Sequence, residues 1–264
     1  MLLAGLIVQN LLVCIALVLL SFLEARTRKS LALLIASVGV FLIGLASIGS
    51  WLYPPLSFLV ILVLAFIAIG AWRWRWLSKT KPGSSSRWHS RLPTILLAAS
   101  GTAMLLTGIV GRTQPDGETI TLRPPFPKGE GFCVLSGGNV LLLNPHYMVG
   151  EKTAASFERH SVDFTKVNAL GFRTTTEKSW NPKPTAPSEY AIFGEPVFAP
   201  CSGKVIEVEN SRPDNPAGYA NRDVNGANRV VLSCDGVHVW LAHLKQASVY
   251  LSRVTTSKSA LRSA

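Results

Sequence analysis

Four long apolar stretches occupy the first 111 residues and constrain the fold more than any other feature of the chain. They cover residues 3–23, 31–50, 55–72 and 93–111. The hydrocarbon core of a bilayer is about 30 Å thick and takes roughly 20 apolar residues in a helix. The sequence therefore predicts an N-terminal α-helical membrane bundle of four transmembrane helices. A cleaved signal peptide is the alternative for the first stretch, but that stretch lacks a basic start and three more follow it.

Positive charge lies between these stretches in an uneven way. The connections after the first and third stretches are basic (Arg26, Arg28, Lys29; Arg73, Arg75, Lys79, Lys81, Arg87, Arg91), whereas the second connection has no charge. Basic loops stay in the cytoplasm, so we expect both chain termini outside it. No acid, His or Lys falls mid-membrane, which argues against a proton-coupled transporter. The lipid bilayer is thus the first expected partner.

The second half of the chain has a different composition. Residues 113–264 carry sixteen Lys and Arg against fourteen acids, so they offer no basic stripe and we expect no nucleic-acid partner. Short apolar runs separated by Gly, Pro and Asn turns predict strands. We expect three regions: a four-span membrane region over 1–111, a linker over 112–130 and an all-β antiparallel sheet domain over 131–264. The predicted strands are GFCVLS, NVLLLN, HSVDFTKV, EPVFAP, GKVIEVE, NRVVLSC and GVHVWLAHL.

Three segments of this β region together resemble one known family. They read FGEPVFAPCSGKV (193–205), GANRVV (226–231) and LAHLKQASV (241–249). The combination is similar to the LytM or lysostaphin-type zinc metallopeptidase domain, also called the duplicated hybrid motif. The resemblance covers roughly residues 130–250. Two positions depart from the family pattern, because Ala227 and Ala247 stand where the family usually has Gly.

The resemblance implies a membrane-anchored metalloendopeptidase that hydrolyses peptides of bacterial peptidoglycan. Such a protein would sit in the bacterial cytoplasmic membrane as a multi-pass protein, with the β domain outside the cytoplasm. One Zn²⁺ would activate a water for attack on the scissile carbonyl. The alternative is a non-catalytic module of the same family, which binds the wall or activates other wall hydrolases.

The resemblance also assigns candidate site residues. Asp163 matches the Asp metal ligand, and His243 matches an assisting catalytic His that acts as general base or stabilises the transition state. The first His ligand has two candidates. His160 lies three residues before Asp163, so on a regular strand it would face away from it. His146 lies on another segment, in the context Asn-x-His, and we favour it as the ligand. His238 lies five residues before His243, so on a regular strand the two side chains face opposite ways, and we interpret His238 as structural.

The end of the chain departs from the family. The third ligand, the last His of a His-x-His motif, is expected some distance beyond His243, but no later His follows. We therefore expect a C-terminally truncated, incomplete site with impaired activity. A shifted reading of permitted codons for residues 252–264 gives QGDNVKVGAPIG, the family's usual continuation. This match predicts a frameshift near Leu251 or Ser252.

The outer half holds Cys133, Cys201 and Cys234. Outside the cytoplasm disulfides can form. Cys201 and Cys234 could form one bridge, and buried free thiols are the alternative.

Overall fold

The computed structural model describes residues 2–49, 57–77, 88–114, 119–150, 152, 156–179, 181, 184–219 and 227–250. The basic residues Lys79, Lys81 and Arg87 and the segment 251–264, with its expected frameshift, lie outside the described residues. The described chain divides into two compact units. Unit 1 comprises Met1–Gln114 and Leu135–Asp163, and unit 2 comprises Pro115–Val134 and Phe164–Ala264.

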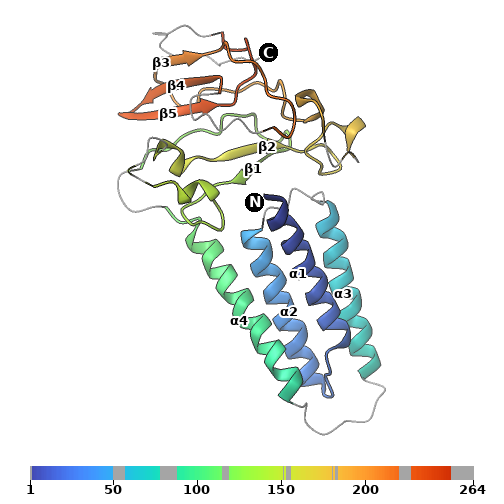
Figure 1. Cartoon of the computed structure of the whole chain (residues 1–264). Coiled ribbons are helices and arrows are strands. Elements are labelled where there is room, and N and C mark those ends of the chain that lie inside the picture. The colour runs from blue at the N-terminus through green and yellow to red at the C-terminus, as the bar shows by residue number, and fades with distance from the viewer. Residues whose placement is uncertain are drawn as a thin grey trace. The chain divides into compact units, whose positions relative to one another are not determined.

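The expected helical N-terminal region is confirmed. It contains four helices, which Figure 1 shows running along one another: α1 (Leu2–Phe22), α2 (Arg28–Ile48), α3 (Ser57–Leu77) and α4 (Trp88–Val110). By length and composition, three segments within the described chain are able to cross a membrane: Arg28–Ile48, Phe58–Leu77 and Arg91–Val110. In α1, the apolar helix assessed in this way is the shorter piece Ile7–Phe22.

The helices pack through a narrow apolar seam. Its fully buried members come from three helices: Val13, Ala16 and Leu20 of α1, Val38, Phe41 and Leu45 of α2, and Leu97 of α4. At the α2–α4 contact, Gly44 and Gly101 let the two backbones meet, since a Cβ on either one would overlap backbone atoms of the other helix. Leu34 of α2 is also buried in this seam and further apolar side chains pack against it, whereas others are exposed, as in Ile61, Leu64 and Ile67 of α3. Small residues at the contact and apolar residues outside are typical of membrane helices.

Helix ends in this unit are closed by specific polar contacts. Thr27 and Ser30 form a reciprocal capping box at the start of α2. The guanidinium of Arg73, on α3, donates hydrogen bonds to the carbonyl oxygens of Leu20 and Leu23 at 2.6 and 2.9 Å. These carbonyls lie at the end of α1, where a helix leaves its acceptors unpaired. Arg73 therefore closes one helix from another.

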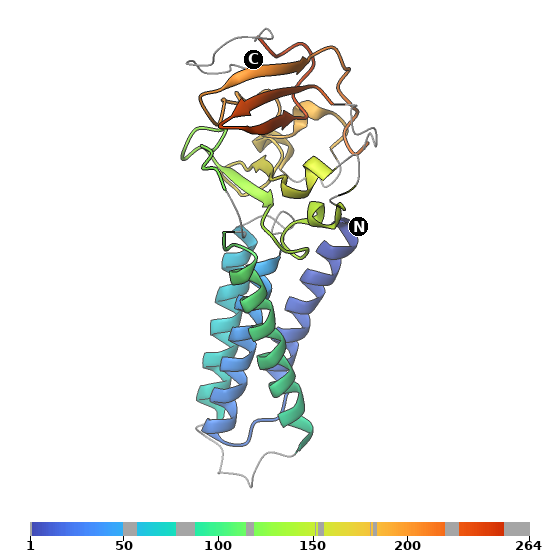
Figure 2. The same ribbon diagram turned by 90° about the vertical axis from the view of Figure 1, so that its left-hand side faces the viewer.

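Small sheets follow the helices, in agreement with the expected β region. β1 (Phe132–Ser136) and β2 (Asp163–Lys166) form a two-stranded sheet. β3 (Lys204–Glu209), β4 (Arg229–Cys234) and β5 (Val237–Ala242) form a three-stranded sheet in that order, and both pairs are antiparallel. Figure 2, turned from Figure 1, shows these three strands side by side. The expected turn at Asp235-Gly236 joins β4 to β5, and both residues have positive φ, 48° and 84°, as a two-residue hairpin requires.

The core of the three-stranded sheet is small and cross-linked. Val205, Val230 and Leu232 are buried on one face together with Cys234. Cys234 forms a disulfide with Cys201, with the two Cα atoms 6.0 Å apart. Of the two alternatives left open by the sequence, a disulfide or free thiols, the structure thus has the disulfide. The bridge joins the segment before β3 to the end of β4.

Two of the predicted strands are absent from the structure, and a third is shorter than predicted. Residues 139–144, NVLLLN, form a turn rather than a strand, because Leu143 N and Asn144 N both donate to Val140 O. Residues 195–200, EPVFAP, have no strand pairing. The strand expected over HSVDFTKV is confined to β2. Its first residue, His160, belongs instead to the 3₁₀ helix η2 (Ser156–His160). Three further 3₁₀ helices are η1 (Pro145–Met148), η3 (Thr176–Lys178) and η4 (Pro187–Glu189).

Candidate metal-binding site

The candidate site centres on Asp163, the first residue of β2. Its carboxylate is about half exposed, at 44% of the side-chain surface. Ser136, the last residue of β1, is buried and donates a hydrogen bond from Oγ to Asp163 Oδ2. The two strands therefore bring together a hydroxyl and a carboxylate that are 27 positions apart in the chain. The hydroxyl fixes the orientation of the carboxylate.

The second candidate ligand, His146, lies next to this carboxylate. Its Nε2 is 3.3 Å from Asp163 Oδ1 and 3.2 Å from Oδ2. His146 is in η1, a 3₁₀ helix that follows the turn at residues 139–144. The structure thus brings together Asp163 and the favoured one of the two candidate His ligands. Both belong to unit 1.

Asn144 fixes the position of His146. Its side-chain oxygen accepts a hydrogen bond from His146 N at 3.1 Å, as an N-cap residue does. Its Nδ2 donates to Gly138 O and Ser161 O, each at 3.1 Å. Asn144 is only 1% exposed, so these partners replace water at every polar atom. One amide therefore ties η1 to the chain just before β2.

Arg159 makes a second connection between the same segments. Its Nη1 donates to the carbonyl oxygens of Tyr147 and Val149, both at 3.0 Å, and its guanidinium lies 4.1 Å from the centre of the Tyr147 ring. A planar guanidinium can bond to carbonyls and stack on an aromatic ring at once. Arg159, which lies in η2, thereby holds the end of η1 against η2.

The spacing of His146 and Asp163 fits two ligands of one zinc ion. Zn–N and Zn–O bonds are each about 2.0–2.2 Å, so two ligands of a tetrahedral site lie roughly 3.3 Å apart. The observed separations of 3.2 and 3.3 Å agree with that value. Among the described residues, no group of three His, Cys, Asp or Glu gathers where a metal could bind. His146 and Asp163 are also within hydrogen-bonding distance of each other, so the described chain shows a His–Asp pair at this position.

His160 occupies a different setting from the one expected. It is the last residue of η2 and is exposed. The parity argument assumed a regular strand from His160 to Asp163, and that assumption is wrong because the strand begins at Asp163. The prediction that His146 is the ligand loses this part of its support and keeps the Asn-x-His context of His146, which lies on a separate segment.

His243, the candidate catalytic residue, belongs to unit 2. It directly follows β5, is exposed and has a φ of 61°. A non-glycine residue at such a φ is uncommon and worth about 1–3 kcal/mol of strain. The contacts around it hold the chain in this conformation. His238, one of the residues of β5, is also exposed.

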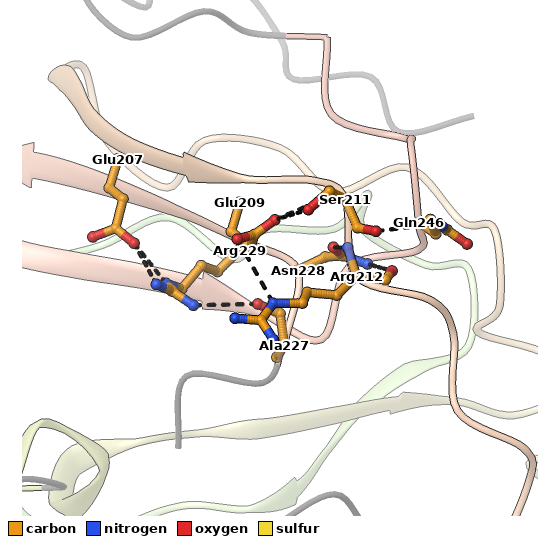
Figure 3. Close-up of polar contacts among 8 residues, drawn as sticks. All are labelled: Glu207, Glu209, Ser211, Arg212, Ala227, Asn228, Arg229 and Gln246. Carbon is orange, nitrogen blue, oxygen red and sulfur yellow. Dashed lines mark hydrogen bonds and ion pairs between the residues drawn. The ribbon is translucent and has the colours of Figure 1, made fainter. Parts of the chain in front are cut away.

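Figure 3 shows part of the network around the segment after His243. Asn228 is buried and exchanges hydrogen bonds with the backbone of Arg212, at 2.9 and 2.8 Å. Its own carbonyl accepts from Leu244 N at 3.1 Å. Gln246 Nε2 donates to Ser211 O at 3.3 Å, as Figure 3 shows. These contacts fix the chain on the C-terminal side of His243.

Charged groups of the network are also paired. Arg229 donates from Nε to Glu207 Oε1 at 2.9 Å (Figure 3), and its guanidinium lies 5.5 Å from the centre of the Trp240 ring. The Ser211 hydroxyl and backbone N–H donate to Glu209 at 2.6 and 3.0 Å. These bonds, the hydroxyl's first, lower the pKa of the Glu209 carboxyl. They favour the charged form, so their contribution to stability is present at neutral pH and is lost as pH falls through the lowered pKa.

Sequence reasoning missed Ser136, Asn144 and Arg159. The Asn-Pro step at 144–145 is a local turn signal, so the N-cap at Asn144 could have been found. No pattern within either segment indicates the contact between Ser136 and Asp163. No family model, curated protein or solved structure matches the chain.

Proposed function

We propose that this chain is a membrane-anchored protein whose outer part carries an incomplete LytM-type zinc peptidase site, directed at peptides of bacterial peptidoglycan and impaired by the lack of a third ligand. The observation that carries the proposal is the approach of His146 Nε2 to both carboxylate oxygens of Asp163, at 3.3 and 3.2 Å. The motif resemblance matched Asp163 to the Asp ligand, and His146 was favoured over His160 as the His ligand. Three helices long and apolar enough to span a membrane support the anchor.

In the proposed reaction, His146 and Asp163 would hold the metal and the other residues would position them. A zinc ion there would supply a bound water of near-neutral pKa and polarise the peptide carbonyl. Ser136 restrains the Asp163 carboxylate, and Asn144 and Arg159 restrain η1 and so the His146 ring. Such outer contacts orient ligands and are worth about 10–100-fold in metal affinity. We assign His243 the assisting role of general base or oxyanion stabiliser.

The location follows from the same proposal. The basic first and third connections lie in the cytoplasm, so α4 emerges outside and unit 2 meets the wall. The disulfide between Cys201 and Cys234 supports this side of the membrane, because disulfides persist in oxidising compartments and are rare in the cytosol. A membrane or wall-hydrolase partner belongs to the alternative function, a non-catalytic module that binds the wall or activates other hydrolases.

Metal titration of the purified full chain tests the assignment. The chain in detergent is titrated with Zn²⁺ against a weak fluorescent chelator, alongside His146→Ala, Asp163→Ala and His160→Ala. We expect wild type and His160→Ala to bind one zinc with equal, weak affinity, and the other two variants to lose it. The matched control is His160→Ala, which removes an exposed imidazole close to the site.

Each other result has a definite meaning. Loss of zinc in His160→Ala with retention in His146→Ala would reverse the ligand assignment. Equal binding by all four proteins would place the metal elsewhere. If wild type binds no zinc but sediments with purified peptidoglycan, the non-catalytic module replaces the peptidase. Release of free amino groups from the same peptidoglycan, in a zinc-dependent manner, measures the peptidase activity directly.

A further inference from the structure

The turn at residues 138–144, here called the α4 turn, is attached to the end of α4. Asn139 donates from its backbone N–H to Gly111 O at 3.0 Å and from Nδ2 to Thr113 O at 3.3 Å. Gly111 is buried, and side-chain atoms of Val140 and Leu143 fill the space that a Cβ there would need. All these residues belong to unit 1. The place of the α4 turn is therefore fixed relative to the helix.

The end of α4 has the character of a membrane boundary. Leu106, Ile109 and Val110 are each more than half exposed, as lipid-facing residues of a single chain are. Arg112, the first charged residue after them, bonds to Gly108 O at 2.8 Å. A long basic side chain at a helix end typically reaches toward the headgroups. The boundary between hydrocarbon and headgroups thus falls near Gly111.

The α4 turn presents two leucines beside this boundary. Leu141 and Leu142 are 49% and 58% exposed, whereas Val140 and Leu143 face Gly111 and Asn144 is buried. The two leucines follow Asn139 by two and three positions, so the chain limits them to about 7–11 Å from its Cα. The headgroup layer on each side of the hydrocarbon is of similar thickness, roughly 5–8 Å. Leu141 and Leu142 can therefore reach the boundary between the headgroups and the hydrocarbon.

We propose that the α4 turn is a membrane-interface anchor, with Leu141 and Leu142 inserted among the headgroups and upper acyl chains of the leaflet at the C-terminal end of α4. We take lipid as the occupant because Asn139 bonds to Gly111 O and Thr113 O and so holds the two exposed leucines close to the end of α4, where Leu106, Ile109 and Val110 are exposed. Apolar side chains beside basic ones are the usual composition of such interfacial elements. The inference rests on the proposed membrane insertion and is independent of the metal chemistry.

The test measures what surrounds residue 142 in a bilayer. Cys14 and Cys133 are replaced by Ser in the full chain, Leu142→Cys is added, and an environment-sensitive fluorophore is attached before reconstitution into phospholipid vesicles. The same label at Val110→Cys reports insertion of α4, and at Lys152→Cys it reports an exposed polar position of unit 1. We expect the label at 142 to lose fluorescence to lipids carrying a shallow nitroxide, as at 110, and to resist aqueous iodide.

A second variant separates lipid contact from a change in folding. Adding Leu141→Asp should reduce quenching at 142 by the nitroxide lipid while leaving quenching at 110 unchanged. Iodide quenching at 142 equal to that at 152 would overturn the proposal, and so would protection from both quenchers, which would mean burial against protein. Absence of lipid quenching at 110 would overturn the membrane insertion itself, a different failure that this control identifies.

Discussion

Single residues with unusual backbone angles lie before and after β5. Within the described chain, Asp235, His243 and Ala247 are the non-glycine residues with positive φ. Asp235 belongs to a hairpin turn that requires this geometry. Ala247 has a φ of 55°, and its N–H is held by Asn210 O at 3.0 Å. The cost of a left-handed alanine is about 1–2 kcal/mol, and the neighbouring contacts keep it in place.

Ala247→Gly should stabilise the chain by about 0.5–1 kcal/mol, because glycine adopts this φ without a Cβ penalty and loses part of the gain through its greater freedom when unfolded. Denaturant unfolding of the full chain in detergent, followed by protection from proteolysis, measures the change. Ala242→Gly is the matched control, since Ala242 ends β5 as a regular strand residue. It should destabilise by a similar amount, and a destabilising Ala247→Gly would contradict the argument.

The candidate site was predictable to the extent that its residues carry family motifs. Asp163 was named from the motif resemblance and His146 was favoured over His160, and the structure places Asp163 and His146 in contact. Ser136 and Asn144 were not named, because what makes them part of the site is a contact across the fold. Ser136 meets Asp163 through the pairing of β1 with β2, and a serine at a strand end has no local signal of that partner.

Helices and strands differ in how far the sequence determines them here. A membrane helix satisfies every backbone group internally, so apolar length alone predicted the four helices. Strands depend on a partner, and the apolar runs at 139–144 and 195–200 have none in the structure. In the first, Asn144 and the preceding glycines favour a turn. Where a hairpin signal was present, at Asp235-Gly236, the prediction was right.

Because α2 and α4 pack closely, we expect the addition of one methyl group at their contact to lower the stability of the helical region. Gly101→Ala places a Cβ against the backbone of Phe41, and overpacking of this kind costs about 1–3 kcal/mol. Gly70→Ala on α3 is the matched control, because its Cβ would meet only the Ile35 side chain, at 3.7 Å. Thermal unfolding in detergent should show a lower midpoint for Gly101→Ala alone. Equal midpoints for the two variants would mean that α2 and α4 do not pack through these glycines.

The disulfide predicts a large effect at the three-stranded sheet. It closes a separation of 33 positions between Cys201 and Cys234, for which loop entropy gives roughly 3–4 kcal/mol. Cys234→Ser should lower the denaturant midpoint of unit 2 accordingly and expose its lysines to trypsin. Cys133→Ser removes a free thiol and should leave the midpoint unchanged. Burial raises the pKa of the Cys133 thiol, so it should also alkylate more slowly than an exposed thiol at pH 8.

At the scale of the whole molecule, charge separates the two halves of the chain. Residues 1–112 hold ten Lys and Arg against one acid, whereas residues 113–264 are nearly balanced. In a membrane protein this asymmetry specifies orientation. The apolar helices alone predict a membrane bundle. The basic loops add a prediction of its orientation across the membrane.

A reporter that is active only in the cytoplasm checks this orientation. Fused after Leu77, at the start of the basic third connection, it should be active; fused after Gly131, beyond α4, it should be silent. An enzyme active only after export should give the opposite pair of results. If the fusion at 131 were active in the cytoplasm, the predicted orientation would be wrong. Unit 2 would then lie on the cytoplasmic side, away from the wall.

The hydrogen bonds between Asn139 and the end of α4 also determine how far the candidate site can travel. His146 follows Asn139 by seven positions, so it lies at most about 25 Å from the helix end even along a fully extended chain. If α4 spans a bilayer as proposed, a site tethered this closely would diffuse in two dimensions with the membrane. Its encounter rate would then depend on the number of partner molecules per unit of membrane area.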